Sequence, residues 1–109
     1  MGTRDGSVDR VYLIVPTEVW TNSHLKLEEK VLFGRILYFT LKGDGALYET
    51  NSKLGRFLGR NDQTVRSYIK RLEKVGLIER LLEDGRRCLI ANYDLIEDKG
   101  WHQVFEWAK

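Results

Sequence analysis

The sequence predicts a mainly helical α+β domain, and three observations in its second half carry the prediction. The first is an amphipathic helix that Asn61 can cap and that buries one apolar stripe, formed by Val65, Tyr68, Ile69 and Leu72. The second is Gly76, which can end this helix in a left-handed conformation before an apolar run over residues 77–82. The third is the pair Asp84-Gly85, a strong signal for a tight β-hairpin. A helix followed directly by a hairpin is therefore expected.

The first half of the chain supplies a scaffold for this unit. Residues 1–10 are polar and are expected to form a flexible arm, and residues 10–15 predict a strand or extended segment that Pro16 ends. One helical turn is expected over residues 17–21. The segment 25–41 predicts a central helix with charged first turns. Its second half is apolar on nearly every side, at Ile36, Leu37, Tyr38, Phe39 and Leu41, and must therefore be buried all round.

A short linker at residues 42–45 breaks the central helix, and residues 46–48 are a candidate strand that returns toward the hairpin. Thr50 is placed to cap a helix that runs to about residue 58. Its inward side chains are expected to be Leu54, Phe57 and Leu58. Gly55 in this helix costs about 1 kcal/mol relative to Ala, and we expect it to allow close approach of the following helix.

The last segment, residues 96–109, predicts an amphipathic C-terminal helix. Its apolar stripe consists of Trp101, Val104, Phe105 and Ala108. Such a stripe must be covered, either by the core of the same protomer, by the equivalent helix of a second copy or by another protein.

Length and composition set the class of protein. The chain has 109 residues, 42% of them hydrophobic and 31% charged, which fits one soluble domain with a single core. No apolar run reaches the ~18 residues of a membrane helix, and residues 1–10 do not resemble a signal peptide. Cys88 is the only cysteine, so it has no internal disulfide partner, and we expect it to pack in a strand. These features predict a cytoplasmic protein that does not bind membranes.

The positive charge of the chain is concentrated in one region. Its net charge is only +2, but residues 53–87 contain ten Lys or Arg against five Asp or Glu. The basic surplus therefore lies entirely within the expected helices and hairpin. A duplex carries a phosphate about every 1.7 Å along its axis, so a patch of this kind is the expected footprint of a DNA-binding protein. The alternative is a solvated cationic surface without such a partner.

The expected order of elements is helix, short strand, helix, tight turn, helix and hairpin, which is that of a winged helix-turn-helix. It comprises a three-helix core and a β wing of two or three strands over residues 11–95, followed by the C-terminal helix. The chain resembles the N-terminal winged-helix domains of plasmid and phage replication initiators and of primosome proteins of the DnaD type. The matching positions are the segment "VYLIVPTEVW" and Thr50, Leu54, Leu58, Gly59, Thr64, Val65, Gly76, Leu77 and Ile78. Gly55 and Asn61 stand where that pattern usually has Ala and Ser, and Tyr93 and Leu95 resemble the end of the wing strand.

The resemblance implies a set of DNA contacts. Phosphates would be met by Lys53, Arg60, Asn61 and Thr64. The major groove would be read by Gln63, Arg66, Ser67 and Lys70. Arg can bond to guanine, and Gln to adenine, through two hydrogen bonds at once. Arg86 and Arg87, placed at the tip of the wing, would touch phosphate or an adjacent minor groove.

Several of these residues also have a purely structural interpretation. Asn61 can serve as a helix cap alone, and Arg66 can pair with Asp62 four residues earlier. Lys70 and Lys74 can be solvated surface residues. Repressors of the MarR and GntR kinds share the central part of the pattern, so the resemblance leaves replication and repression both open.

An enzymatic role finds no support in the sequence. His24 and His102 lack a second metal ligand at helical spacing, and the glycines of residues 43–45 are too few for a phosphate loop. We therefore expect a protein without catalytic activity, metal or cofactor.

The expected function is DNA binding in the initiation or control of replication on a plasmid or phage. Duplex DNA is the expected ligand and single-stranded DNA the alternative. A homodimer is favoured because two-fold dimers are the usual readers of paired half-sites. A transcriptional repressor, or an adaptor that binds a replication protein, is the alternative function.

Overall fold

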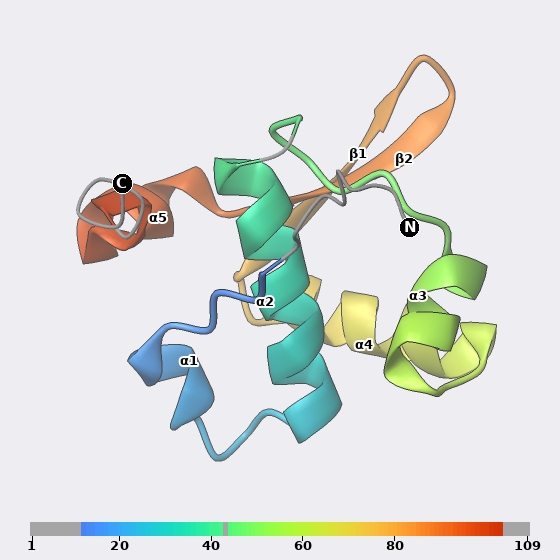
Figure 1. Cartoon of the computed structure of the whole chain (residues 1–109), viewed down its shortest axis with the longest axis horizontal. Coiled ribbons are helices and arrows are strands. Elements are labelled where there is room, and N and C mark those ends of the chain that lie inside the picture. Colours follow the sequence, from blue (N-terminus) through green and yellow to red (C-terminus); the bar gives the residue numbers. More distant parts are fainter. Residues whose placement is uncertain (1–11, 43, 104–109) are drawn as a thin grey trace, which may run out of the picture.

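The computed structural model describes residues 12–42 and 44–103, and its architecture is α+β and mainly helical (Figure 1). The helices are α1 (Thr17–Trp20), α2 (Leu27–Leu41), α3 (Asn51–Leu58), α4 (Asp62–Lys74) and α5 (Tyr93–Lys99). The strands are β1 (Ile78–Glu83) and β2 (Arg86–Ala91), and a 3₁₀ turn, η1, covers Trp101–Gln103. The predicted class, mainly helical α+β, is confirmed, and the arrangement is compatible with the expected winged helix.

Helix α2 runs through the middle of the molecule, with α1 and α5 toward one side and α3 toward the other (Figure 1). It begins at Leu27 rather than at residue 25, because the backbone N–H of Lys26 donates to the Glu29 carboxylate at 2.8 Å. In the second half of α2, Ile36, Leu37 and Tyr38 are buried as predicted, whereas Phe39 and Leu41 are only partly buried. The β1–β2 hairpin projects beyond the helical body and leaves its tip exposed (Figure 1).

Helices α3 and α4 form the expected helix, tight turn and helix. The Thr50 side chain accepts from the Lys53 N–H at 3.1 Å, and the Asn61 side chain accepts from the Thr64 N–H at 2.8 Å. Both predicted caps are therefore confirmed. Gly76 has a φ of 82° and ends α4 as predicted. The predicted stripe of α4 is buried in the core, at Val65, Tyr68, Ile69 and Leu72.

Gly55 allows close approach of the turn after α3, and not of the following helix as we expected. A β-carbon at this position would lie within 3.0 Å of the Arg60 carbonyl oxygen, which belongs to the turn after α3. The Arg60 N–H also donates to the Gly55 carbonyl at 2.9 Å. Gly55 therefore lets the turn fold back onto its own helix, whereas Val65 of α4 is at ordinary contact distance.

The hairpin has the predicted tight turn, because Asp84 and Gly85 both have positive φ, at 50° and 78°. Residues 46–48 are not a full strand. Leu47 pairs with Leu89 of β2 through two backbone hydrogen bonds of 2.9 Å, as an isolated bridge. Cys88 is buried in β2 as expected, and burial raises the pKa of its thiol.

The predicted helix over residues 96–109 is wrong in both its start and its continuity. The Asn92 side chain accepts from the backbone N–H groups of Asp94 and Leu95, so α5 begins at Tyr93. Tyr93 and Leu95 therefore lie in a helix and do not end a strand. Gly100 adopts a left-handed φ of 68° and ends α5.

Trp101 is a core residue and not a dimer contact. Only 8% of it is exposed, and its ring meets Phe33 edge to face with the centroids 5.7 Å apart. Its indole N–H donates to the Glu18 carboxylate at 3.3 Å. The other residues of the expected interface, Val104, Phe105 and Ala108, lie outside the described part of the chain. None of the helices described is long and apolar enough to cross a membrane.

Candidate nucleic-acid interface

The outer face of α4 presents polar and cationic side chains to solvent. Its exposed members are Gln63, Arg66, Ser67, Lys70 and Lys74, and Thr64 is half-buried at the start of the helix. The expected alternative of an ion pair between Arg66 and Asp62 is absent from the described structure. Within residues 12–42 and 44–103, Lys70 and Lys74 form no ion pair either. The positive charge of this face is therefore not neutralised by nearby carboxylates.

Arg60 lies in the turn between α3 and α4 as predicted, but it already has a carboxylate partner. Its guanidinium forms an ion pair with the Glu28 carboxylate and so ties the α3–α4 turn to the start of α2. A hydrogen bond to the Glu28 backbone, and then the charge of Arg60, lower the pKa of the Glu28 carboxyl. We therefore assign Arg60 to the scaffold. Arg80 on β1 is similarly paired with Glu73 of α4, at 3.6 Å.

An ion pair that the sequence analysis missed fixes the segment before α3. Arg35 of α2 binds both carboxylate oxygens of Glu49, at 2.6 and 2.8 Å, and the two side chains are each only 14% exposed. The Arg35 guanidinium also lies against the rings of Phe39 and Phe57. Hydrogen bonding to Arg35 lowers the pKa of the Glu49 carboxyl. No motif in the sequence signals a contact between residues so far apart.

Lys53 forms an exposed ion pair with the carboxylate of Glu49. Its ammonium lies 3.5 Å from Glu49 but remains 62% exposed. A surface pair of this kind is weak and is screened by salt, so the Lys53 ammonium can exchange Glu49 for another anion. Arg56, one helical turn farther along α3, is also exposed and was not singled out from the sequence.

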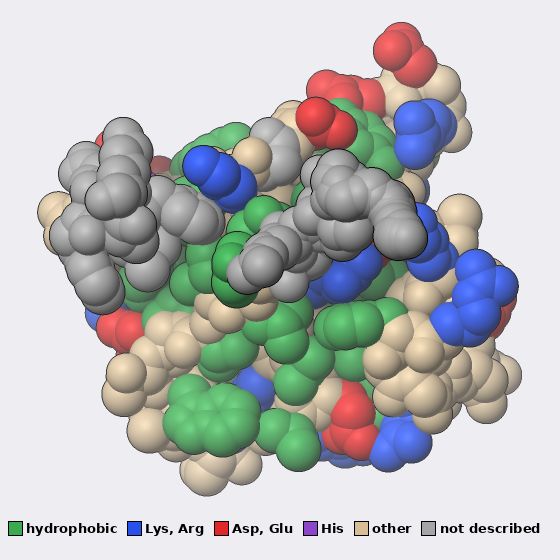
Figure 2. Space-filling view, in the orientation of Figure 1, with side chains coloured by type: hydrophobic (Ala, Val, Ile, Leu, Met, Phe, Trp, Pro, Cys, Tyr) green, Lys and Arg blue, Asp and Glu red, His purple; other side chains and the backbone are tan. Residues whose placement is uncertain are grey.

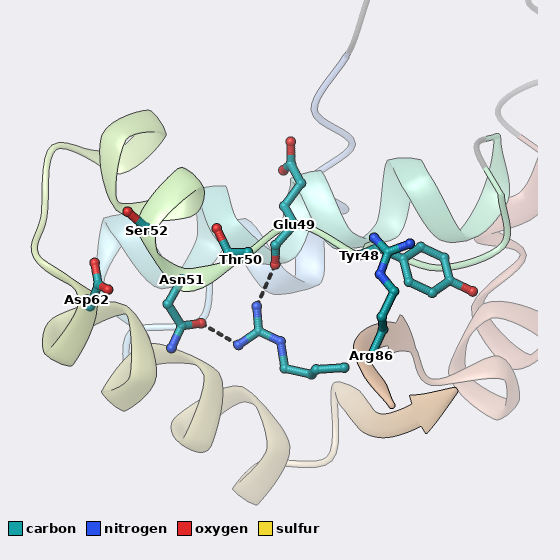
Figure 3. Close-up of a pocket in the computed structure, with 8 residues that line it drawn as sticks. Tyr48, Glu49, Thr50, Asn51, Ser52, Asp62 and Arg86 are labelled. Atoms are coloured by element: carbon teal, nitrogen blue, oxygen red, sulfur yellow. Dashed lines mark hydrogen bonds between the residues drawn. The ribbon is translucent and has the colours of Figure 1, made fainter. Parts of the chain in front are cut away.

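Arg87 lies inside the hairpin junction and not at the hairpin tip. Its guanidinium donates to the main-chain carbonyl of Glu49 at 2.6 Å and to the side-chain oxygen of Asn51 (Figure 3). Both acceptors are neutral, so no carboxylate in the described structure neutralises the Arg87 charge. Burial, and then the charge of Arg80, lower the pKa of Arg87. The Glu49 carboxylate points away from it (Figure 3).

Arg86 follows the turn, as predicted, and lies over an aromatic ring. Its guanidinium is 5.0 Å from the centre of the Tyr48 ring (Figure 3). The Tyr48 hydroxyl donates to the Glu83 carboxylate, and this bond raises the pKa of Tyr48 to about 12. Tyr48 thus remains a neutral platform for the Arg86 side chain, beside the Glu83–Arg86 pair that flanks the turn.

These residues surround an open hollow of about 440 Å³ where the hairpin meets the starts of α3 and α4 (Figure 3). It is lined by Tyr48, Glu49, Thr50, Asn51, Ser52, Asp62, Arg86 and Arg87. Two guanidinium groups therefore adjoin it, against the single exposed carboxylate of Asp62. Figure 2 shows further Lys and Arg side chains over the α3 side of the molecule, with acidic side chains toward the hairpin tip.

The predicted DNA-contact residues thus fall into two groups. One group, Gln63, Thr64, Arg66, Ser67 and Lys70, lies on α4, and the other, Arg86 and Arg87, lines the hollow beside it. Asn61 caps α4, Lys53 lies on α3, and Arg60 lies in the turn between the two helices. Among the described residues, no group of three His, Cys, Asp or Glu is placed to hold a metal ion.

Comparisons of the chain with protein-family models, curated proteins and solved structures found no match.

Proposed function

We propose that the chain is a winged helix-turn-helix module that binds double-stranded DNA, with α4 as the reading helix and the β1–β2 hairpin as the wing. The observation that carries this proposal is that some cations are paired with carboxylates whereas those on the outer face of α4 are not. Arg35, Arg60 and Arg80 are paired with carboxylates and hold the scaffold together. Arg66 and Lys70 on the outer face of α4 have no such partner within the described residues.

The hollow beside α4 extends the same surface to the hairpin. No carboxylate among the described residues neutralises the Arg87 charge there, since both its acceptors are neutral, and Arg86 adjoins it. A DNA strand that passes from α4 to the hairpin would meet these guanidinium groups through its phosphates. The base edges in the major groove would be read by Gln63 and Arg66, whose side chains can each form two hydrogen bonds to one base.

A pair of charge-matched variants tests the proposal. Arg66→Gln removes one positive charge from the proposed interface, and Lys99→Gln removes one from α5, on the far side of the molecule (Figure 1). Fluorescence anisotropy on the duplex selected from a random pool should show a loss of about 1 to 3 kcal/mol for Arg66→Gln, with weaker preference at one base pair. Lys99→Gln should bind almost as the unaltered chain does. Equal effects of the two changes would contradict the proposal.

The biological setting we propose is replication of a plasmid or phage, supported by the resemblance to initiator and primosome domains. Repression of transcription by the same surface is the rival within DNA binding. A homodimer remains part of the proposal, although Trp101 no longer supports it because that side chain is buried in its own core. Sedimentation of the full chain with and without a two-half-site duplex measures the stoichiometry directly.

A further inference from the structure

We propose that Leu82 on the hairpin is an apolar wedge that enters a base step of bound duplex DNA and unstacks it; the inference rests on the proposed function. Leu82 is 76% exposed, more than any other large hydrophobic side chain in the described part of the chain. It lies two residues before the Asp84-Gly85 turn, on a hairpin that projects from the body. Leu82 therefore makes little contribution to the core.

The alternation of strand side chains places Leu82 on the hairpin face that is turned to the helices. Arg80 and Leu82 share one face of β1, and the register puts Leu82 opposite Arg87. Arg80 reaches Glu73 of α4, and Arg87 reaches Asn51 of α3. The face that carries Leu82 is thus the one beside the proposed reading helix.

The two faces of the hairpin differ in charge. Beside Leu82 lie the guanidinium groups of Arg87 and of Arg80, the latter paired with Glu73. The opposite face carries two carboxylates, those of Glu79 and Glu83, and the guanidinium group of Arg86. The first face therefore attracts phosphates more strongly than the second, on which two carboxylates outnumber one arginine. DNA that contacts the hairpin is therefore expected on the Leu82 side, where the Arg87 charge lies opposite the leucine.

An aliphatic side chain in this position has a known physical use. Proteins that insert Leu, Phe or Met between stacked bases bend the duplex and gain contact area in return. A single exposed leucine is common on protein surfaces and by itself indicates nothing. Its place opposite Arg87, whose charge no carboxylate among the described residues neutralises, and on the face turned to α4 is what points to a base step as its contact.

Leu82→Ala and Leu81→Ala form a matched test. Leu81 is the same residue type in the same strand, but it lies on the opposite face and is 43% exposed. Duplexes chosen by selection from a random pool would carry 2-aminopurine at successive positions beside the α4 site. Anisotropy would report binding, and 2-aminopurine emission would report unstacking. Thermal unfolding would check that both variants are folded.

For the unaltered chain and for Leu81→Ala we expect bright emission at one step. We also expect affinity about tenfold higher when that step is mismatched, since a mismatch removes the cost of unstacking. Leu82→Ala should lose both effects. Binding without emission at any position, or loss of emission in both variants, overturns the wedge and leaves DNA binding intact. An absence of binding in the anisotropy measurement overturns the proposed function itself.

Discussion

Arg87 of the hairpin donates a hydrogen bond to the main-chain carbonyl of Glu49 across 2.6 Å. The carboxylate of the same Glu49 is held by Arg35 of the central helix. Glu49 thus accepts hydrogen bonds from two arginines, from Arg87 of the hairpin through its backbone and from Arg35 of α2 through its side chain. The relation fixes the hairpin to the start of α3, and it keeps the Arg87 charge free of carboxylates beside the proposed DNA surface.

Arg87→Met should therefore weaken both stability and DNA binding. Loss of hydrogen bonds from a charged group to half-buried acceptors costs about 2 kcal/mol, which urea unfolding would measure. Affinity should fall by a similar factor for every duplex sequence, because Arg87 meets phosphate and no base. Arg86→Met, which removes a charge without these hydrogen bonds, is the control and should lower affinity with little change in stability. Sequence-selective loss for Arg87→Met would contradict the assignment.

Trp101→Ala should destabilise the chain by about 3 to 5 kcal/mol, because a large buried aromatic side chain would be replaced by a cavity. Trp20→Ala is the matched control, since Trp20 is 51% exposed and should cost far less. Thermal or urea unfolding gives the difference. Sedimentation of the folded fraction should show the same oligomeric state as the unaltered chain. If the unaltered chain were a dimer and Trp101→Ala a stable monomer, Trp101 would have to lie in a dimer interface.

Gly55→Ala should destabilise the chain even though Ala favours helices. The gain in helix propensity is about 1 kcal/mol. Against it, the new β-carbon would lie within 3.0 Å of the Arg60 carbonyl oxygen, which is backbone and moves only if the turn moves. Overpacking of this kind costs roughly 1 to 3 kcal/mol. The melting temperature should fall, and a rise would show that the α3–α4 turn relaxes freely.

The ion pair of Arg35 and Glu49 should make stability depend on pH on the acid side. Hydrogen bonding to Arg35 lowers the pKa of Glu49 below its ordinary value of 4.5. A lowered pKa in the folded state adds stability above pH 4.5 that is lost as the pH falls through the folded-state pKa. The difference in unfolding free energy between the unaltered chain and Glu49→Gln should shrink as the pH is lowered from neutrality. When Arg35→Gln is already present, adding Glu49→Gln should change the unfolding free energy much less at every pH.

Local signals in the sequence account for most of the fold. The caps and turns follow from residue type at Thr50, Asn61, Gly76 and the Asp84-Gly85 pair, because each acts on its own neighbours. Trp101 does not continue the predicted helix, because helical spacing runs across Gly100, whereas that glycine takes a left-handed conformation. Periodicity alone does not show which partner covers an apolar side chain, and Trp101 is covered by Phe33 of α2.

The candidate site was less predictable than the fold, because long-range pairing decides which cations are free. Arg60 and Arg66 are the same residue type six positions apart, and the sequence gives no reason to separate them. Only the proximity of Glu28 on α2 removes Arg60 from the candidate surface. Arg87 was expected at a tip because it follows the turn by two residues, yet its side chain turns back to Asn51.

The salt dependence of duplex binding tests the central claim most directly. About six phosphate contacts by α4 and the hairpin would give a slope near −5 when the logarithm of the association constant is plotted against the logarithm of salt concentration. Anisotropy of a labelled duplex, titrated at several salt concentrations, measures this slope. We predict tight binding at low salt that weakens steeply. A flat response, or no binding at low salt, would contradict the account.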